Sequence, residues 1–408
     1  MSYRDIVLGI RTERSVVGQV TKMEYKDREC LNMVISNLIC CVDNNEILLY
    51  SRMNERADKW KHNPKGISNY RVKQAIDWLE QEGYAFNTIA SKYQLYSDTR
   101  HTSYVMASDK FAKTFHTKER EATAKQAYVD SMPVVILRDK DGSDIVYRDS
   151  KDIRGIETLM RSMNNNNSQF CVEDENGQTI NTLYKRLFKE VWTLNGRMYS
   201  PGVMNVENRA SKGRLKFTIN KMSSTECDFN CLHARLMADL YGWTVPEGDV
   251  YLNILPTEKH TPENRNLMKG AVNRILNCGS HKKATASVKK WMLDDAVAGH
   301  TFKSAATIVK LVHDFLGPIR QHLYKDRLGL RLANLESDIM SDIVQVFVLL
   351  NRPCLPVHDS AIVLREDQEL LAKTMADCYR KHLNVDRKVI LKYNMWIDGK
   401  EVKQDCSC

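Results

Sequence analysis

Two short apolar runs flank a polar tight turn over residues 355–363, which read Leu-Pro-Val-His-Asp-Ser-Ala-Ile-Val. Apolar runs of this length around a polar turn predict a β-hairpin with Asp359 at its tip, beside His358. A carboxylate held in this way suits a metal ligand. The alternative is an ordinary turn residue, because a second His-Asp pair, His313 and Asp314, lies in a pattern that predicts a core helix.

Asp228 has a comparable setting upstream. Residues 224–230 predict a short strand that runs into a helix over residues 232–241, which Gly242 ends. Two aspartates at strand ends, brought together by a sheet, form a minimal holder for two Mg²⁺ ions about 4 Å apart. Such a pair of ions clamps the attacking and leaving oxygens in nucleotidyl transfer.

A helix with clear start and stop signals lies between the two carboxylates. Thr261 is a candidate N-cap, Pro262 suits the first helical position, and Gly279 follows the last turn. Polar residues recur on one side at steps of four, namely Arg265, Lys269, Asn273 and Asn277, and apolar ones lie on the other, namely Met268, Val272, Ile275 and Leu276. Two cations one turn apart match a triphosphate, and the amides beyond them match a base or sugar. A solvated helix face is the alternative.

Residues 193–200 form a fourth element, in which Gly196 permits a close backbone approach and Arg197 offers a planar fork for phosphate. In isolation they predict only a turn. Together the four elements resemble the core of family A DNA polymerases and of bacteriophage-type single-subunit RNA polymerases. The resemblance covers residues 190–365: a Thr-x-x-Gly-Arg motif, motif A at Asp228, an Arg-x-x-x-Lys helix, and motif C at His358 and Asp359, in that order.

The resemblance implies a right-hand palm in which Asp228 and Asp359 hold two Mg²⁺ ions, for which Mn²⁺ can substitute. It implies that Arg265 and Lys269 bind the triphosphate of the incoming nucleotide, with Lys269 catalytic. It also implies that Arg197, with Gly196 and His358, contacts the nucleic acid.

Several positions depart from the DNA polymerases. His233 stands where those enzymes carry a glutamate that helps to exclude the ribose 2′-hydroxyl, and Asn273 and Asn277 stand where aromatic residues are usual. Ser360 resembles the RNA polymerase version of motif C. We therefore expect His233, Asn273 and Asn277 to contact the nucleotide, with ribonucleotides slightly preferred. The short interval between the carboxylates predicts reduced fingers.

Residues 335–338 predict the start of a helix before motif C. Glu336 or Asp338 could line the site from there. The simpler interpretation is that these carboxylates stabilise the helix N-terminus through its dipole.

Composition agrees with this expectation. With 408 residues, 43% of them hydrophobic, the chain can bury two or three cores. Its net charge of +9 favours a polyanionic partner, although many proteins are as basic. Residues 1–5 lack a signal peptide's apolar stretch, and no segment reaches the roughly 18 apolar residues of a membrane span, so we expect a cytoplasmic chain in a bacterial host or phage-infected cell and no membrane partner. Eleven scattered cysteines indicate reduced thiols.

The first 125 residues predict a winged-helix-like domain. Helices are expected over residues 32–42 and 69–81, and strands over 84–91 and 101–107. Two helices followed by a two-stranded ribbon are typical of a winged helix. Its DNA-facing side would carry basic residues, namely Lys61, His62, Lys65, Arg71, Lys73 and Lys92. Such folds also serve as protein-docking modules.

The segment that follows is less informative. Residues 113–126, rich in Lys, Thr and Ala, predict the linker of the winged helix. Residues 126–190 predict a partial thumb-like or connecting region, with strands over 133–137 and 144–147, a helix over 150–163 and a loop over 164–167. This region is too short for a full thumb, so a second subunit, a single-strand-binding protein or the winged helix would have to supply processivity.

We therefore expect an α+β protein: a winged-helix-like domain at 1–125, a connecting region at 126–190, and a polymerase palm with reduced fingers at 191–408. The expected activity is DNA-templated joining of nucleoside triphosphates, with RNA or primer synthesis slightly preferred, in a phage or mobile element. One alternative is a compact DNA polymerase. The other is a winged-helix replication initiator or regulator whose palm has lost activity.

Overall fold

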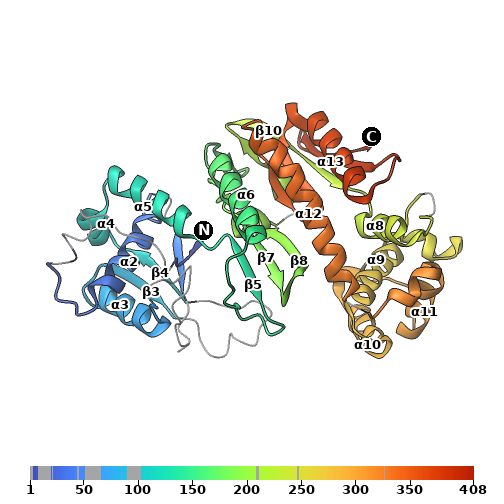
Figure 1. The fold of residues 1–408 in the computed structure, drawn as a ribbon, viewed down its shortest axis with the longest axis horizontal. Helices are drawn as coiled ribbons and strands as arrows, with labels where there is room; N and C mark the ends of the chain where they lie inside the picture. Colours follow the sequence, from blue (N-terminus) through green and yellow to red (C-terminus); the bar gives the residue numbers. More distant parts are fainter. Residues whose placement is uncertain are drawn as a thin grey trace. The chain divides into compact units, whose positions relative to one another are not determined.

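The computed structural model describes residues 3–7, 20, 22–43, 46–50, 66–89, 103–207, 211–245, 248–325 and 327–408. Contacts divide the chain into two units. The N-terminal unit comprises residues 1–135, 148–185 and 200–206, and the C-terminal unit comprises residues 136–147, 186–199 and 207–408. Helices and small sheets occur in both (Figure 1), in agreement with the expected α+β class.

The N-terminal unit contains a four-stranded sheet in the order β1-β2-β4-β3, in which β1 runs parallel to β2 and the other pairs are antiparallel. The strands are β1 (Tyr3–Asp5), β2 (Ile47–Tyr50), β3 (Ala85–Thr88) and β4 (Ser103–Ala107). The helices are α2 (Arg28–Ile39), α3 (Asn69–Gln81), α4 (Asp109–Phe115), α5 (Lys118–Ser131), α6 (Lys151–Asn167) and the short α7 (Pro201–Met204), and β6 spans Val172–Glu173. Because α2 is buried from Cys30 to Ile39, this helix forms the centre of the core.

The helix predicted over residues 69–81 is confirmed as α3, with the Ser68 hydroxyl accepting from the N–H of Arg71. The helix predicted over 32–42 is observed as α2, which begins earlier because the Asp27 carboxylate caps it by accepting from the N–H of Cys30. Strands β3 and β4 lie within the two predicted strands, whose remaining parts include residues outside the described ranges. Four of the predicted basic residues also lie outside the described ranges: Lys61, His62, Lys65 and Lys92.

Two segments are helical where the sequence predicts none. The linker predicted over residues 113–126 is wrong, because all of these residues except His116 and Thr117 lie in α4 and α5, which Ser108 and Thr117 cap. The loop predicted over residues 164–167 is also wrong, because the last turn of α6 contains it. The buried Asn164 side chain donates to the carbonyl of Tyr184 at 3.0 Å and accepts from its N–H at 2.8 Å, so it does not compete with the helix backbone.

Five antiparallel strands of a larger sheet form the centre of the C-terminal unit, in the order β11-β12-β10-β13-β14. Its strands are β10 (Met222–Phe229), β11 (Leu355–Val357), β12 (Ser360–Leu364), β13 (Ile390–Ile397) and β14 (Lys400–Ser407), and the short β9 (Thr218–Ile219) also pairs with β10. Helices α8 (Leu232–Tyr241), α12 (Leu328–Leu349) and α13 (Gln368–Leu383) pack on one another and on this sheet. The predicted hairpin around Asp359 and the predicted strand and helix around Asp228 are confirmed.

Three further helices pack together (Figure 1): α9 (Pro262–Asn277), α10 (His281–Trp291) and α11 (Ala305–Leu316). Helix α9 begins as predicted, with Thr261 accepting from the N–H of Asn264. A Cβ at Gly270 would lie 2.1 Å from the indole nitrogen of Trp291, so α9 and α10 approach closely there. Short 3₁₀ turns connect the elements: η2 (Gly213–Lys216), η3 (Leu252–Ile254), η4 (Thr257–Lys259), η5 (Asp295–Val297), η6 (Gly317–His322) and η7 (Arg365–Asp367).

A small sheet in the order β5-β7-β8 provides the strand that carries Arg197. Its strands are β5 (Val135–Arg138), β7 (Lys185–Lys189) and β8 (Val191–Tyr199), and α12 packs along β8. A Cβ at Gly196, where φ is +76°, would lie 2.8 Å from side-chain atoms of Asn334 and Phe188, so only glycine allows the strand to approach α12 so closely. Residues 144–147 are not the predicted strand, because only Asp144 pairs, in an isolated bridge to Arg138.

No helix in the described ranges combines the length and the apolar character of a membrane span.

Candidate active site

The C-terminal unit contains a cavity of about 1320 Å³. The sheet side of its lining comes from β10, β13, β14 and the β11–β12 turn, and the helical side comes from α8, α9 and α12. Ten residues that the sequence singles out line it, namely Arg197, Asp228, His233, Arg265, Lys269, Asn273, Asn277, Glu336, His358 and Asp359. Gly196 does not line the cavity, and its role in the structure is the close approach of β8 to α12.

Asp228 and Asp359 meet at this cavity. Asp228 lies opposite Ser360 in the antiparallel register of β10 and β12. Asp359 sits in the tight turn between β11 and β12. His358, the first residue of that turn, has a φ of +58°. Burial, and then the charge of Asp359, raises the pKa of Asp228 well above its ordinary value, and burial together with the charge of Glu336 raises that of Asp359. The structure therefore gathers negative charge at one point.

The chemistry of this pair fits a hard divalent cation. Both residues offer carboxylate oxygens, and one oxygen of Asp228 is buried without a hydrogen-bond partner among the described residues. The neighbouring Glu226 is already engaged, since it accepts from the Ser360 hydroxyl at 2.6 Å. Mg²⁺ commonly takes only one or two protein carboxylates and completes its shell with water and substrate phosphates, so a pair of aspartates is sufficient.

Helix α9 presents the predicted polar stripe to the cavity. Lys269, Asn273 and Asn277 are exposed, and Lys269 makes no ion pair with any described residue. Its ammonium is close enough to lower the pKa of Asp228, although burial and Asp359 outweigh this effect. Arg265 is engaged differently, because its Nε donates to Asp249 at 2.5 Å. One of the two predicted triphosphate cations is thus free and the other shares its charge with a carboxylate.

Glu336 lines the cavity, but its position in the helix differs from the predicted one. The prediction that a helix starts near residue 335 is wrong: α12 begins at Leu328, and Glu336 lies in its interior with its side chain only 1% exposed. It accepts from Arg197 through Nε at 2.7 Å and Nη2 at 2.6 Å, and from His233 through Nε2 at 2.8 Å. We call Arg197, Glu336 and His233 the carboxylate clasp. Its sequence signal is a glutamate among apolar residues at helical spacing, namely Leu332, Ile339, Met340 and Ile343.

His358 also lines the cavity, and its contact with nucleic acid stays a prediction. Its ring packs edge-on against Tyr199 at 5.7 Å, and burial with the charge of Arg197 lowers its pKa. Asp338, the other carboxylate considered from the sequence, does not line this cavity and instead accepts from the buried Arg186 at 2.5 Å.

Sequence reasoning missed a group of cations on the sheet side of the cavity: Lys212, Arg214, Lys392 and Lys403. In the strand register Lys392 of β13 lies opposite Asp228 of β10, and Lys403 of β14 lies opposite Asn394 of β13. Acidic neighbours accompany them, since Arg214 lies 3.7 Å from Glu226. The alternation of polar residues along β13 is the signal that could have identified this face.

The N-terminal unit holds the remaining predicted residues. Arg71 forms a two-pronged ion pair with Asp27, at 2.5 Å through Nε and 2.9 Å through Nη2, and Lys73 on α3 is partly exposed. The guanidinium of Arg71 therefore already contributes to the packing of α3 against the start of α2.

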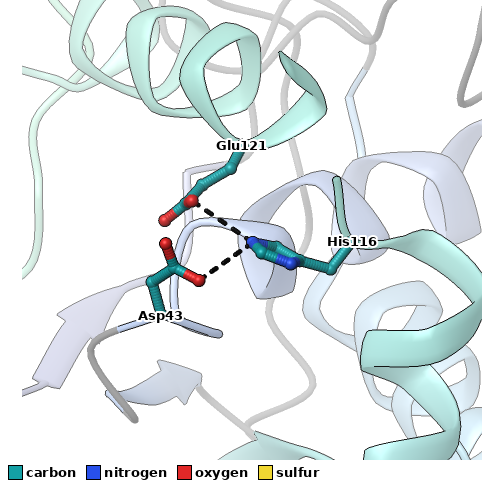
Figure 2. Close-up of side chains that lie close together, drawn as sticks. All are labelled: Asp43, His116 and Glu121. Atoms are coloured by element: carbon teal, nitrogen blue, oxygen red, sulfur yellow. Dashed lines mark hydrogen bonds and ion pairs between the residues drawn. The ribbon is translucent and has the colours of Figure 1, made fainter. Parts of the chain in front are cut away.

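A second cluster in this unit brings potential metal ligands together (Figure 2). The Nε2 atom of His116 lies 3.2 Å from Asp43 and 3.2 Å from Glu121. The ammonium of Lys118 pairs with Asp43, and that of Lys125 with Glu121 at 2.5 Å. Because two lysines already balance the two carboxylates, this cluster needs no metal and joins the end of α2 to α4 and α5.

No family model matches the chain, and no curated protein is significantly similar to it.

Proposed function

We propose that the C-terminal unit is a two-metal nucleotidyltransferase that joins nucleoside triphosphates on a DNA template. The observation that carries the proposal is that Asp228 and Asp359, from paired strands and their turn, line the same cavity as the cationic stripe of α9. Nucleotidyl transfer needs a metal site next to a triphosphate site. The two carboxylates suit the metal site and the two cations suit the triphosphate site. The motifs reach this arrangement from four separate elements, which supports the polymerase palm that the sequence predicts.

Each group has a definite task in this proposal. Lys269 would contact the triphosphate directly, because it makes no ion pair with any described residue, and Arg265 would do so while still bonded to Asp249. Asp228 and Asp359 would hold Mg²⁺, or Mn²⁺ in its place, which supplies positive charge to the reacting phosphate when bound. The strand's 3′-hydroxyl would lose its proton to water as its oxygen bonds to the α-phosphorus, the bond from the α-phosphorus to the bridging oxygen would break, and pyrophosphate would leave.

The proposal includes DNA binding by the N-terminal unit. Its α3 helix precedes the β3–β4 pair, as the sequence predicts for a winged helix. The structure departs from the predicted two helices and two-stranded ribbon, because β2 lies between α2 and α3 and the sheet has four strands. The unit's predicted contacts with DNA are Arg71 and Lys73. Arg71 is already paired with Asp27, so Lys73 is the freer of the two to bind DNA. We propose that the whole chain acts in the cytoplasm of a bacterial host or phage-infected cell.

Ribonucleotides are the proposed substrates. His233 and Asn277 line the cavity and can hydrogen-bond to a ribose hydroxyl, and a site that pairs with a hydroxyl rejects the analogue that lacks it. A compact DNA polymerase is the alternative, and it would use the same Asp228 and Asp359 with deoxyribonucleotides.

The test supplies the purified full chain with primed and unprimed DNA templates, Mg²⁺ or Mn²⁺, and either rNTPs or dNTPs. The wild-type protein should incorporate nucleotides, and Asp228→Ala and Asp359→Ala should each abolish incorporation while template binding persists. Asp405→Ala is the matched control, because it removes an exposed carboxylate that lines the same cavity from β14. Wild-type rates in either aspartate variant would overturn the proposal.

A further inference from the structure

Glu336 holds a proton on the Nε2 atom of His233. Burial raises the pKa of Glu336, but the hydrogen bond from His233 and the charge of Arg197 together outweigh burial, so its pKa lies below the ordinary value. An ionised carboxylate can only accept hydrogen bonds, so the Nε2 atom of His233 must carry a proton. No hydrogen bond among the described residues uses the other ring nitrogen, Nδ1. The clasp therefore leaves Nδ1 as the ring nitrogen with a free hydrogen-bonding position, on a side chain that lines the cavity.

We propose that Glu336 is a positioning residue that gives His233 its selectivity for a ribose 2′-hydroxyl. This inference rests on the proposed function and identifies what sets the sugar preference of the same site. With Nε2 bonded to Glu336, neutral His233 accepts a hydrogen bond from the hydroxyl through Nδ1. Protonated His233 donates one there instead, which a hydroxyl can also accept. A deoxyribonucleotide offers neither partner and leaves Nδ1 unpaired in a half-buried site.

The geometry explains why a carboxylate is needed at this position. Arg197 uses two donors on the two oxygens of Glu336, and His233 shares the Oε2 atom with it. A glutamine would turn one donor group toward the guanidinium and could also donate to His233, so the imidazole could carry its proton on Nδ1 instead. An aspartate keeps the charge and both acceptors on a shorter side chain.

The experiment compares Glu336→Gln and Glu336→Asp with a matched control, Asp239→Asn. Asp239 lies on α8, the helix that carries His233, and it accepts from the Tyr379 hydroxyl at 2.5 Å and from Arg387 at 2.7 Å. It does not line the cavity. The readout is the ratio of kcat/KM for UTP to that for dTTP on one primed template. Glu336→Gln should lower this ratio by about tenfold or more, as expected for loss of one hydrogen bond to a charged network.

Glu336→Asp should retain more of the ratio than Glu336→Gln, and Asp239→Asn should leave it unchanged even if the protein melts earlier. An unchanged ratio in Glu336→Gln, or a wild-type preference for dTTP, would overturn the inference while the nucleotidyltransferase itself stands. If the wild-type protein incorporates no nucleotide, the proposed function fails. The inference is then decided by calorimetric binding of ATP against 2′-deoxy-ATP. A fall in that ratio in Glu336→Gln supports the clasp, and no change refutes it.

Discussion

The N–H of Phe229 donates to the carbonyl of Asp359 across 3.1 Å. This main-chain bond joins Phe229, the last residue of β10, to the turn between β11 and β12. Phe229 directly follows Asp228, and the carbonyl that accepts the bond belongs to Asp359 itself. The two carboxylates are thus brought together by backbone pairing, while their side chains repel each other. A site of this kind keeps its frame when one side chain changes.

Asp228→Asn should therefore stabilise the metal-free protein while it removes activity. Burial and the charge of Asp359 both disfavour the charged Asp228 side chain, and asparagine has the same shape without the charge. A gain of about 1 kcal/mol would raise the Tm of a unit of this size by about 2–4 °C. Scanning calorimetry in EDTA measures this shift, with Asp405→Asn as control. A lower Tm than that of the wild type would contradict the account of charge crowding.

The two cations of α9 should differ in importance. Lys269→Ala should lose several hundredfold in kcat/KM, on the order of 3–4 kcal/mol by analogy with other donors that stabilise charge. Arg265→Ala should lose less, because Asp249 already shares its charge. Steady-state kinetics on one template measure both effects. If both variants have the same kcat/KM as the wild type, the polar stripe of α9 is only a solvated helix face.

Asp249→Ala extends this test, because it releases Arg265 from its ion pair while both cations remain. We expect the nucleotide KM to fall or stay constant in this variant and to rise in Arg265→Ala. A rise in both would show that Asp249 is needed to hold Arg265 in place.

The sequence predicted local structure best where one residue type decides it. Thr261 caps α9 as expected, Ser68 caps the predicted helix over residues 69–81, and the polar turn at His358 and Asp359 separates two strands. These signals act within a few residues of one another. The spatial grouping of Asp228, Lys269 and Asp359 followed from motif order, and the structure places all three around one cavity.

Long-range partners account for what the sequence did not predict. Asn164 stays helical because its amide bonds to Tyr184, and nothing near Asn164 in the sequence indicates that partner. The start of α12 has no side-chain cap, since Arg327 precedes it in the left-handed region, so the helix boundary was placed too late. Glu336 consequently looked like a residue near a helix start, although it lies on a buried face.

The N-terminal unit offers a separate test through Asp27. Its hydrogen bonds with Arg71 outweigh its burial, so the pKa of Asp27 lies below the ordinary value. A folded-state pKa below the unfolded one contributes stability above the unfolded pKa, and this contribution is lost as pH falls through the folded one, at about pH 4 and below. Asp27→Asn keeps the helix cap and removes the charge, and it should cost about 0.5–1 kcal/mol at pH 7.

Hydrogen exchange of α2 and α3 amides in the full chain measures this effect. Protection in the wild type should fall toward that of Asp27→Asn as the pH is lowered to 3, and the two should differ most at neutral pH. Asp130→Asn, an exposed position on α5, serves as control. A constant difference between wild type and Asp27→Asn at all pH values would show that charge is not the cause.

The sugar preference should respond to His233 only when the clasp is changed with it. From the sequence alone, His233→Glu is expected to shift the preference toward dNTPs, because glutamate stands there in DNA polymerases. In the structure this change would place a second carboxylate against Glu336, which is 1% exposed and lies 2.8 Å from the present imidazole. The repulsion of two buried carboxylates should lower the stability of the single variant and obscure any effect on selectivity.

The double variant His233→Glu with Glu336→Gln removes that repulsion and leaves one carboxylate to pair with Arg197. We expect it to recover stability relative to His233→Glu and to incorporate dNTPs at a higher ratio to rNTPs than the wild type. Thermal unfolding and competitive incorporation of UTP against dTTP measure the two effects. If His233→Glu alone is as stable as the wild type, the contact between residues 233 and 336 is not the one that governs this site.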